Sequence, residues 1–277
     1  MKSLRLAAFL VVGRLYLKLM KQHSVQLEFL GTGTSQGVPV IGCTCSVCLS
    51  KDKRDSRLRS SVIITVNGKK IVIDTGPDFR YQMLRSGNID VDAVLFTHEH
   101  MDHISGLDDI RAINFIQRKN MPLYGSVGVE ESLHRIYHYA FTKNPYPGVP
   151  VIDFNLIENK PFEILGTRVI PIYVKHGRMP VFGFRFGDLT YITDARYIEE
   201  EELEKVKGSK IVILNALRKE EHFSHLNLEQ ALDLMEKIKP EQGYFTHVSH
   251  LLGKYADIEK ELPANISLAY DGLIVNC

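Results

Sequence analysis

The sequence predicts an α/β protein that contains mixed β-sheets. In the first part of the chain, short apolar runs alternate with tight turns, and Asn67-Gly68 is a strong two-residue hairpin signal between runs at 62–66 and 70–74. From residue 199 onward, helical stretches alternate with short apolar runs, which is the pattern of βα units. Hairpins followed by βα units favour mixed sheets whose outer faces are covered by helices.

The individual elements follow from local patterns. Strands are expected where short apolar runs are bounded by turns, at residues 25–30, 62–66, 70–74, 93–97, 210–214, 244–246 and 267–275. Two longer stretches, 162–174 and 181–193, are expected to be hairpins that turn at Gly166-Thr167 and Gly187-Asp188. Helices are expected from apolar spacing, or from a charged run with one solvated face, at 107–118, 130–139, 199–207 and 228–238.

Length and composition are those of one large domain. The chain has 277 residues, of which 44% are hydrophobic, enough for a sizeable core. Its 34 basic and 33 acidic residues nearly balance, so it lacks the basic excess of a nucleic-acid-binding protein. Its apolar runs fall short of the ~18–20 residues of a membrane span. We therefore expect a small-molecule substrate as the partner, and neither a nucleic acid nor a membrane.

Residues 1–23 are expected to be a dispensable extension, and residues 24–277 a single domain. The first twenty residues are basic and apolar and resemble a weak signal peptide. However, Arg14 and Lys18 stand where a small-residue cleavage site should be, which argues against export. Met20 is an alternative start, and a functional signal or a surface helix is the other alternative.

Three of the four cysteines, Cys43, Cys45 and Cys48, form the pattern C-x-C-x2-C. They are too crowded for a disulfide framework, so a metal site in a reducing compartment, the cytoplasm, is the better interpretation. Three thiolates need a fourth ligand to complete a tetrahedral structural zinc site, and His250 is the candidate. Free reduced thiols are the alternative, and Cys277 is interpreted as a bystander.

The most informative stretch reads H-x-H-x-D-H directly after an apolar run. It contributes His98, His100, Asp102 and His103, a donor set that suits borderline divalent metals such as zinc, manganese or iron. A strand end followed by a tight loop can point alternate side chains at two neighbouring places, as a two-metal site requires. A chance histidine-rich loop is the alternative.

Three further candidates stand at the ends of apolar runs downstream: His176, Asp194 and His247. Loops after strands are where catalytic groups collect. Taken singly, each of the three would more often be structural. Their order after the histidine-rich motif is what indicates a common site.

Together these motifs resemble those of the metallo-β-lactamase superfamily, over about residues 25–277. The resemblance implies a four-layer αββα sandwich with two metal sites. It implies that one ion is held by His98, His100 and His176, that the other is held by Asp102, His103 and His247, and that Asp194 bridges both.

The implied reaction is attack by a hydroxide held between the two metals, with the negative charge of Asp194 between the cations. His225, Asp194 and Asp102 are the predicted catalytic residues. Asp74, in Ile73-Asp74-Thr75-Gly76, would orient a ligand or loop rather than bind metal, and the capping of a turn is an equally good interpretation.

A narrower resemblance is to the phosphoribosyl cyclic phosphodiesterases of the carbon–phosphorus lyase pathway. It rests on Gly-Thr-Gly at 31–33, Gln-Gly-Val-Pro at 36–39, the cysteine pattern and T-H-x-S-H at 246–250. In that branch the cysteines and the second histidine of T-H-x-S-H hold a structural zinc. His225 matches the branch's general acid, which protonates the leaving-group oxygen. A surface role for His225, or His222 as the acid, are the alternatives.

The predicted function is therefore hydrolysis of small, cyclic phosphodiesters by a cytoplasmic enzyme with two zinc or manganese ions (iron is a third candidate) and one structural zinc. Other enzymatic readings are a tRNA 3′-processing nuclease, against which the balanced charge argues, a pyrroloquinoline-quinone biosynthesis protein, and a thioester or lactam hydrolase. A metal-stabilised scaffold is the non-enzyme alternative. The exact substrate, the metals and the oligomeric state stay open, and a homodimer is one option.

Two other segments are distinctive. The aromatic stretch 134–149 is interpreted as ordinary packing, with a lid or a dimer contact as alternatives. The glycine-rich loop 31–37 has no helix after it, so it is interpreted as a turn rather than a phosphate cradle.

Overall fold

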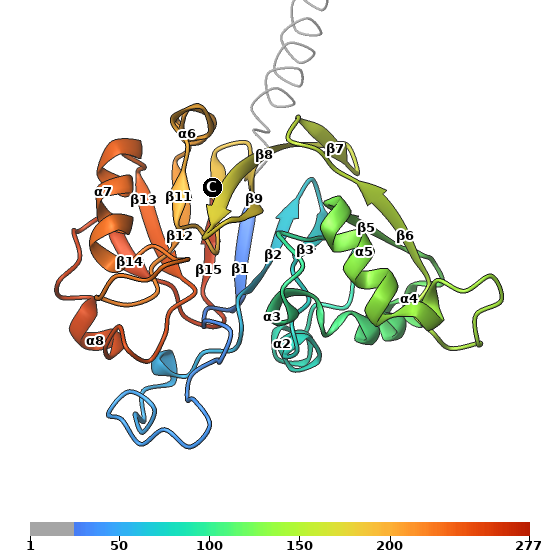
Figure 1. Cartoon of the computed structure of the whole chain (residues 1–277), viewed down its shortest axis with the longest axis horizontal. Coiled ribbons are helices and arrows are strands. Elements are labelled where there is room, and N and C mark those ends of the chain that lie inside the picture. The colour runs from blue at the N-terminus through green and yellow to red at the C-terminus, as the bar shows by residue number, and fades with distance from the viewer. Residues whose placement is uncertain (1–24) are drawn as a thin grey trace, which may run out of the picture.

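The computed structural model describes residues 25–277, so the extension expected at 1–23 lies outside the described residues. Within these residues, two β-sheets pack face to face and helices cover both outer surfaces (Figure 1). This arrangement confirms the predicted αββα sandwich.

The first sheet has the strand order β15-β1-β2-β3-β4-β5-β6. The strands from β15 to β3 pair antiparallel and those from β3 to β6 pair parallel. Their bounds are β1 (Gln26–Gly31), β2 (Ser61–Val66), β3 (Lys69–Ile73), β4 (Ala93–Leu95), β5 (Met121–Gly125), β6 (Ile152–Leu156) and β15 (Ile274–Asn276).

The second sheet repeats this scheme, with the order β11-β8-β9-β10-β12-β13-β14 and β7 attached to β8. Pairing is antiparallel up to β10 and parallel from β10 to β14. The bounds are β7 (Phe162–Ile164), β8 (Thr167–His176), β9 (Met179–Phe186), β10 (Leu189–Tyr191), β11 (Tyr197–Ile198), β12 (Ile211–Asn215), β13 (Gln242–Thr246) and β14 (Ile266–Leu268). Both sheets are thus mixed, as predicted.

The helices are short, and each buries one side against a sheet or a loop. Their bounds are α2 (Phe79–Ser86), α3 (Met101–Ile104), α4 (Ile110–Gln117), α5 (Val127–Ile136), α6 (Glu200–Val206), α7 (Leu228–Ile238) and α8 (Tyr255–Ile258). Short 3-10 turns lie at η1 (Lys53–Asp55), η2 (Leu107–Asp109) and η3 (His138–Ala140). Across residues 25–277, none of the helices combines the length and the apolar content needed to cross a membrane.

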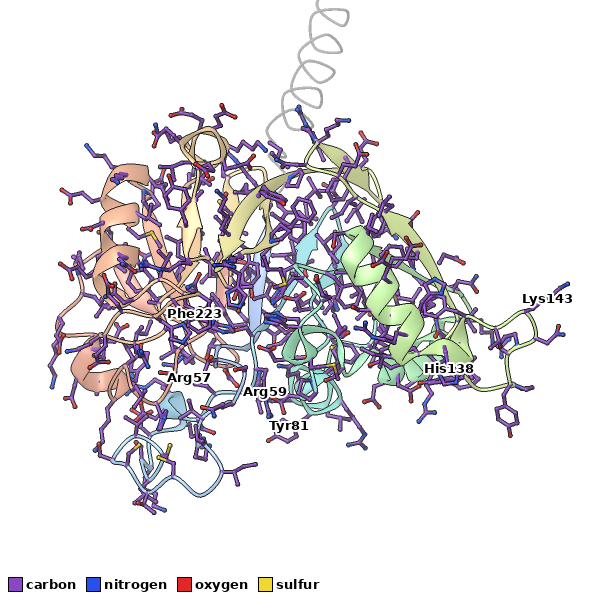
Figure 2. The ribbon with its side chains drawn as sticks, viewed as in Figure 1. Arg57, Arg59, Tyr81, His138, Lys143 and Phe223 are labelled. Atoms are coloured by element: carbon purple, nitrogen blue, oxygen red, sulfur yellow. The ribbon has the colours of Figure 1, made fainter. Side chains whose placement is uncertain are left out.

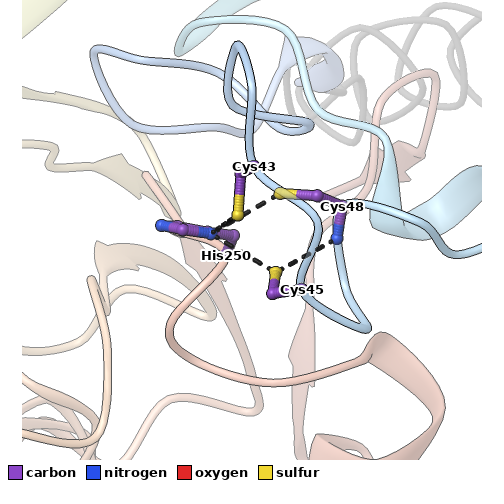
Figure 3. Close-up of side chains that lie close together, drawn as sticks. All are labelled: Cys43, Cys45, Cys48 and His250. Atoms are coloured by element: carbon purple, nitrogen blue, oxygen red, sulfur yellow. Dashed lines mark hydrogen bonds between the residues drawn. The ribbon is translucent and has the colours of Figure 1, made fainter.

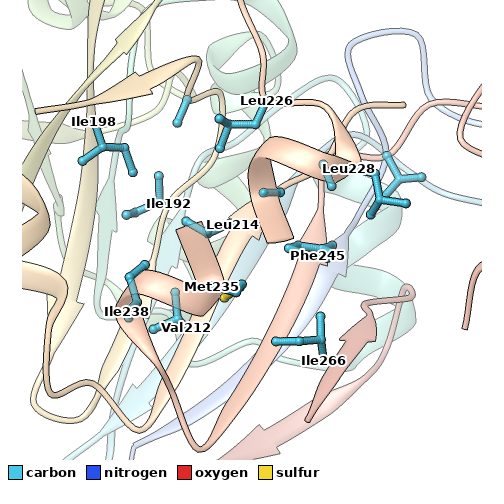
Figure 4. Close-up of a cluster of buried hydrophobic side chains, with 14 of the residues drawn as sticks. Ile192, Ile198, Val212, Leu214, Leu226, Leu228, Met235, Ile238, Phe245 and Ile266 are labelled. Carbon is cyan, nitrogen blue, oxygen red and sulfur yellow. The ribbon is translucent and has the colours of Figure 1, made fainter. Parts of the chain in front are cut away.

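Apolar clusters join the layers because strands buried on both faces are apolar on both. On β2, Ile64 points between the sheets while its neighbour Ile63 points to the outer helices. On the other side of the molecule, Phe245 of β13 packs with Met235 of α7 (Figure 4). Phe245 is fully buried, which stabilises the fold by about 1.5–3 kcal/mol relative to exposure.

The prediction of a single closing strand at 267–275 is wrong. The segment is divided between β14 and β15, which lie in different sheets. At the crossing, the carboxylate of Asp271 accepts hydrogen bonds from the backbone N–H groups of Thr32 (2.9 Å) and Leu58 (2.8 Å). Gly272, with φ +90°, then turns the chain toward β15.

Candidate metal centre and active site

The predicted metal ligands meet where the strands of the two sheets end. β4 leads into the loop that carries His98 and His100, and then into α3, which carries the last two residues of the motif. His176 is the last residue of β8, Asp194 follows β10, and His247 follows β13. The two sheets therefore contribute from opposite sides to one cluster.

Asp194 lies at the centre of this cluster. Its Oδ2 atom is 3.3 Å from Nε2 of His103, and its Oδ1 atom is 3.2 Å from Nε2 of His247. Nε2 of His103 is also 3.2 Å from Oδ2 of Asp102. Ligand atoms of Asp102, His103 and His247 lie within 4.8 Å of one another, and so do those of His98, His103 and Asp194.

The imidazoles of His98, His100 and His176 form the other side of the cluster. Their ring centroids are 4.7 Å apart for His98 and His100, 5.1 Å for His100 and His176, and 5.8 Å for His98 and His176. The structure thus brings together every residue predicted for the two-metal site. How they divide between two ions stays a prediction.

Polar contacts on the far side of the rings aim them at the cluster. In four of the histidines the Nδ1 atom has a partner: Thr97 Oγ1 for His98 (2.9 Å), Asp74 Oδ2 for His103 (2.7 Å), the Ser224 carbonyl for His176 (2.8 Å) and Ser60 Oγ for His247 (3.1 Å). Such partners set the tautomer and turn Nε2 toward the cluster, where Nε2 of His247 also lies 3.3 Å from the Thr34 hydroxyl. Sequence reasoning missed Thr97, Ser60 and Ser224, since hydroxyl and carbonyl partners carry no distinctive spacing.

Asp74 is fully buried, and both of its carboxylate oxygens already accept hydrogen bonds. Its Oδ1 accepts the backbone N–H of Thr97, and its Oδ2 accepts the Thr97 hydroxyl, both at 2.8 Å. With the His103 bond, Asp74 ties the end of β3 to the histidine-rich loop and orients one ring of the cluster. These bonds run to residues 23 and 29 positions away, as expected of a side chain that orients a ligand and a loop, and the role itself stays a prediction.

The electrostatics of the cluster are those of a cation site. Burial acts to lower the pKa of His103, but the three carboxylates around it outweigh burial and raise its pKa well above the usual range. Burial lowers the pKa of His98 well below its usual range. Nε2 of His98 is buried without a hydrogen-bond partner among residues 25–277, and Nε2 of His103 lies beside the carboxylates of Asp102 and Asp194. An unpaired buried nitrogen costs about 1–3 kcal/mol, so this set of imidazoles and carboxylates fits divalent metals.

Backbone strain is concentrated at the same place. Asp74, Asp194 and His247 have φ angles of +66°, +56° and +56°. This left-handed region costs a non-glycine residue about 1–2 kcal/mol, and such residues cluster at functional sites. At Asp194 and His247 this conformation lies at or shortly after the end of a strand and turns the side chain toward the cluster, and at Asp74 it turns the side chain toward Thr97 and His103.

The second predicted site is also assembled. Nδ1 of His250 lies 3.3 Å, 3.4 Å and 3.5 Å from the Sγ atoms of Cys43, Cys45 and Cys48 (Figure 3). All four ligand atoms lie within 4.8 Å of one another. The Cys48 backbone N–H and the His250 ring lower the pKa of Cys45 to about 6. Three thiols and one imidazole fit a tetrahedral structural zinc.

The cysteine loop, residues 32–60 between β1 and β2, is attached to the active site. The Thr34 N–H donates to the carbonyl of Val248, between the two histidines of T-H-x-S-H, at 3.2 Å. Farther along the loop, the carboxylate of Asp55 accepts the N–H of Tyr255 at the start of α8, at 2.6 Å. A metal in the cysteine loop would therefore stiffen the support of His247.

His225 lies at the edge of the cluster. Its ring centroid is 4.5 Å from that of His176 and 4.8 Å from that of His247. Its Nδ1 atom is 3.8 Å from Oδ1 of Asp194 and has no hydrogen-bond partner among the described residues. Burial, followed by the charge of His247, lowers the pKa of His225 to about 3. Ligand atoms of His176, Asp194 and His225 lie within 4.8 Å, so this ring could bind a metal or hold a proton.

The position of His225 is set by two local features. The N–H of Leu226 donates to the carbonyl of Ala195, next to Asp194, at 2.8 Å. Asn227 then begins α7 with a capping box, in which its side chain accepts the N–H of Gln230 and the Gln230 side chain accepts the N–H of Asn227. His222 is farther out, with its ring centroid 5.1 Å from that of His225.

The comparisons with known proteins decide the family. The beta-lactamase superfamily domain matches residues 69–248 of this chain. The chain belongs to the metallo-β-lactamase superfamily. Within it the chain is a PhnP-like member: a crystal structure described as a new diphosphatase from the PhnP family superimposes with a TM-score of 0.86 at 39% identity, covering 92% of this chain and 97% of that one.

Two further proteins are similar to this chain, one in sequence and one in fold. A protein of Porphyromonas gingivalis named octanoyltransferase is 41% identical over 247 residues, 88% of this chain and 50% of that protein. The zinc-bound PqqB of Methylobacterium extorquens shares the fold, with a TM-score of 0.74 at 19% identity, covering 91% of this chain and 100% of that one. The chain spans half or less of the length of the curated relatives it matches first.

Proposed function

We propose that this superfamily hydrolase is a metal-dependent phosphodiesterase that acts on small phosphodiesters, cyclic ones included. The observation that carries the proposal is His225, a buried imidazole at the edge of the metal cluster whose Nδ1 has no partner among residues 25–277. Hydrolysis of a phosphodiester needs a proton donor for the leaving oxygen beside the activated water. The likeness to a PhnP-family diphosphatase supports the same chemical class.

The residues divide the work by position. His98, His100 and His176 would hold one divalent ion, and Asp102, His103 and His247 the other. When bound, two such ions supply hydroxide near neutral pH and polarise a phosphoryl oxygen. Asp194 lies between the two donor sets, where its negative charge reduces the repulsion of two cations.

His225 would deliver its proton to the departing oxygen as the phosphorus–oxygen bond breaks. In the buried site the neutral ring is favoured, because its pKa is about 3. The negative charge of a bound phosphodiester beside the ring opposes this and favours the imidazolium.

The metals and the surroundings are part of the proposal. Manganese or zinc, with iron as the third candidate, would occupy the active site, and one zinc the cysteine loop. The near balance of charge supports a small substrate over a nucleic acid. The crowded cysteines support a reducing compartment, the cytoplasm, and a homodimer stays a prediction.

The test is turnover of bis(p-nitrophenyl) phosphate by manganese-loaded protein. The variant His225→Ala is expected to lose 10²–10⁴-fold in kcat on a diester with an alkyl leaving group, on the order of the contribution of a general acid, and much less on bis(p-nitrophenyl) phosphate, because nitrophenolate departs without a proton. His138→Ala is the matched control, because this exposed histidine lies far from Phe223 and the centre of the molecule (Figure 2). Wild-type protein that binds its metals yet turns over no phosphodiester would refute the proposal.

One other function has a specific observation behind it. The Porphyromonas gingivalis relative is named for octanoyl transfer, which is acyl chemistry, although this chain spans only half of it. Hydrolysis of an octanoyl thioester by the same metal-loaded protein is the corresponding assay. Thioester turnover that exceeds phosphodiester turnover, and that His225→Ala leaves intact, would favour the acyl function.

A further inference from the structure

A cavity of about 700 Å³ opens beside the metal cluster, lined on the cluster side by His100 and His176. Its other walls are the turn between β8 and β9, with Gly177, Arg178 and Met179, and the loop that carries Phe223 and Ser224. The two walls touch: a side chain at Gly177 would lie 3.5 Å from Cβ of Ser224. The cavity is large enough for a substituted ring.

Phe223 is the aromatic wall of this cavity. It is 81% exposed, and it lines the same cavity as His100 and His176, toward the middle of the view in Figure 2. The His222 ring, at a centroid distance of 4.7 Å, supports it from one side. A large apolar ring held in the open at a catalytic cavity offers a stacking surface to a planar group.

Arg178 is the charged wall. It is exposed, and no residue within 25–277 forms a hydrogen bond or an ion pair with its guanidinium. Two other cations on β8 and β9 are paired, Lys175 with Glu199 and Arg185 with the carbonyls of Lys205 and Lys207, whereas Arg168 near the other end of β8 is exposed outside the cavity. A free guanidinium in a cavity is suited to a carboxylate or phosphate oxygen pair.

The cavity lies on the side of the proton donor, because Ser224 in its wall directly precedes His225. Resting on the proposed phosphodiesterase function, we infer that this cavity receives the leaving group, and that Phe223 and Arg178 select a planar ring bearing a second negative charge. In the reaction the water oxygen bonds to phosphorus, the bond to the leaving oxygen breaks, and the His225 proton passes to that oxygen. One proton of the water stays on the phosphoryl product, and the other is released and restores the proton of His225. Phe223 and Arg178 thus choose which alcohol departs.

The test compares methyl phosphodiesters that differ only in the leaving group: phenol, 4-carboxyphenol and ethanol. For each substrate, the ratio of kcat/KM in the variant to kcat/KM in the wild type is compared, so the intrinsic reactivity of the substrate cancels. Arg178→Ala is expected to lower kcat/KM by about 10-fold to 100-fold for the carboxyphenyl ester and to leave the phenyl ester nearly unchanged. Phe223→Ala is expected to lower kcat/KM for both aryl esters by about threefold to tenfold relative to its effect on the ethyl ester.

Arg168→Ala is the matched control, an exposed arginine near the other end of β8. Equal losses on all three esters, or none, in Arg178→Ala would overturn the inference while the phosphodiesterase function stands. Calorimetric binding of methyl (4-carboxybenzyl)phosphonate, in which a carbon–phosphorus bond replaces the bond to the leaving oxygen, gives an independent readout. Arg178-dependent binding without turnover in the wild type would refute the function and keep the cavity assignment; neither binding nor turnover would refute both.

Discussion

The ring N–H at Nδ1 of His176 donates to the carbonyl oxygen of Ser224, at 2.8 Å. This bond joins the end of β8 to the loop that carries Phe223 and His225, 48 residues farther along the chain. One contact therefore orients a predicted metal ligand, places the predicted proton donor and closes the wall of the adjoining cavity.

The bond between Asp74 and His103 should control metal affinity. Asp74→Asn keeps the size of the side chain but removes the charge that orients the His103 ring and makes it more basic. We expect active-site metal affinity to weaken by about 10-fold to 100-fold, measured by competition with a chelator of known affinity. Asp153→Asn, an exposed change in β6, serves as the control. Unchanged affinity in Asp74→Asn would mean that Asp74 only shapes the loop.

The cysteine loop should hold its own zinc. Cys45→Ser removes one of the four donors around His250, so we expect about one zinc ion fewer per chain and a lower thermal midpoint. Cys277→Ser is a matched control, since Cys277 lies outside the donor cluster. Elemental analysis and thermal unfolding give the two readouts. Full zinc content in Cys45→Ser would contradict the assignment.

The approach of Gly76 to Asp102 should be intolerant of any side chain. A Cβ atom at Gly76 would lie 2.0 Å from the carbonyl oxygen of Asp102, so Gly76→Ala must displace α3 and its ligands. We expect a loss of about 1–3 kcal/mol in unfolding free energy, together with weaker metal binding. In Gly187→Ala the added methyl group meets open space but φ is +59°. That variant should lose about 1–2 kcal/mol of stability and keep its metal affinity. Equal metal affinity in the two variants would contradict the prediction.

Asp92 should contribute stability that acid removes. Partial burial raises its pKa, but the Lys70 backbone N–H and the ammonium groups of Lys119 and Lys69 outweigh burial, so its pKa lies below the usual value. A carboxyl group with a lowered pKa stabilises the fold above its unfolded-state pKa, about 3.9, and that contribution disappears as pH falls through the lower folded-state value.

Asp92→Asn should therefore reduce the unfolding free energy by about 0.5–1 kcal/mol at neutral pH, and the difference from wild type should vanish in strong acid. Denaturant unfolding at a series of pH values measures this difference. Asp90→Asn, a change at a more exposed carboxylate, should show no such pH dependence. A difference that persists undiminished in acid would exclude a charge effect at Asp92.

Many of the helices and strands follow from local sequence pattern, but their exact ends and the shortest elements do not. The Asn67-Gly68 hairpin lies between β2 and β3 as predicted, with positive φ at both residues. The helix expected at 130–139 instead begins at Val127, because the Ser126 side chain caps it by accepting the Val129 N–H. The short elements β5, β6, α2 and α8 were not predicted, since each is too short for its periodicity to stand out.

For this protein, the sequence alone determined the kinds of donors and their order: H-x-H-x-D-H, three ligands at strand ends, and C-x-C-x2-C. These are readable because metal chemistry restricts residue type and because a strand end and its loop restrict spacing. Only the tertiary structure decided which groups orient those donors. Ser60 reaches His247 across 187 residues, and the segment 269–273 carries the chain from one sheet to the other. Such contacts depend on how the two sheets pack, and a local sequence pattern cannot indicate a partner so distant in the chain.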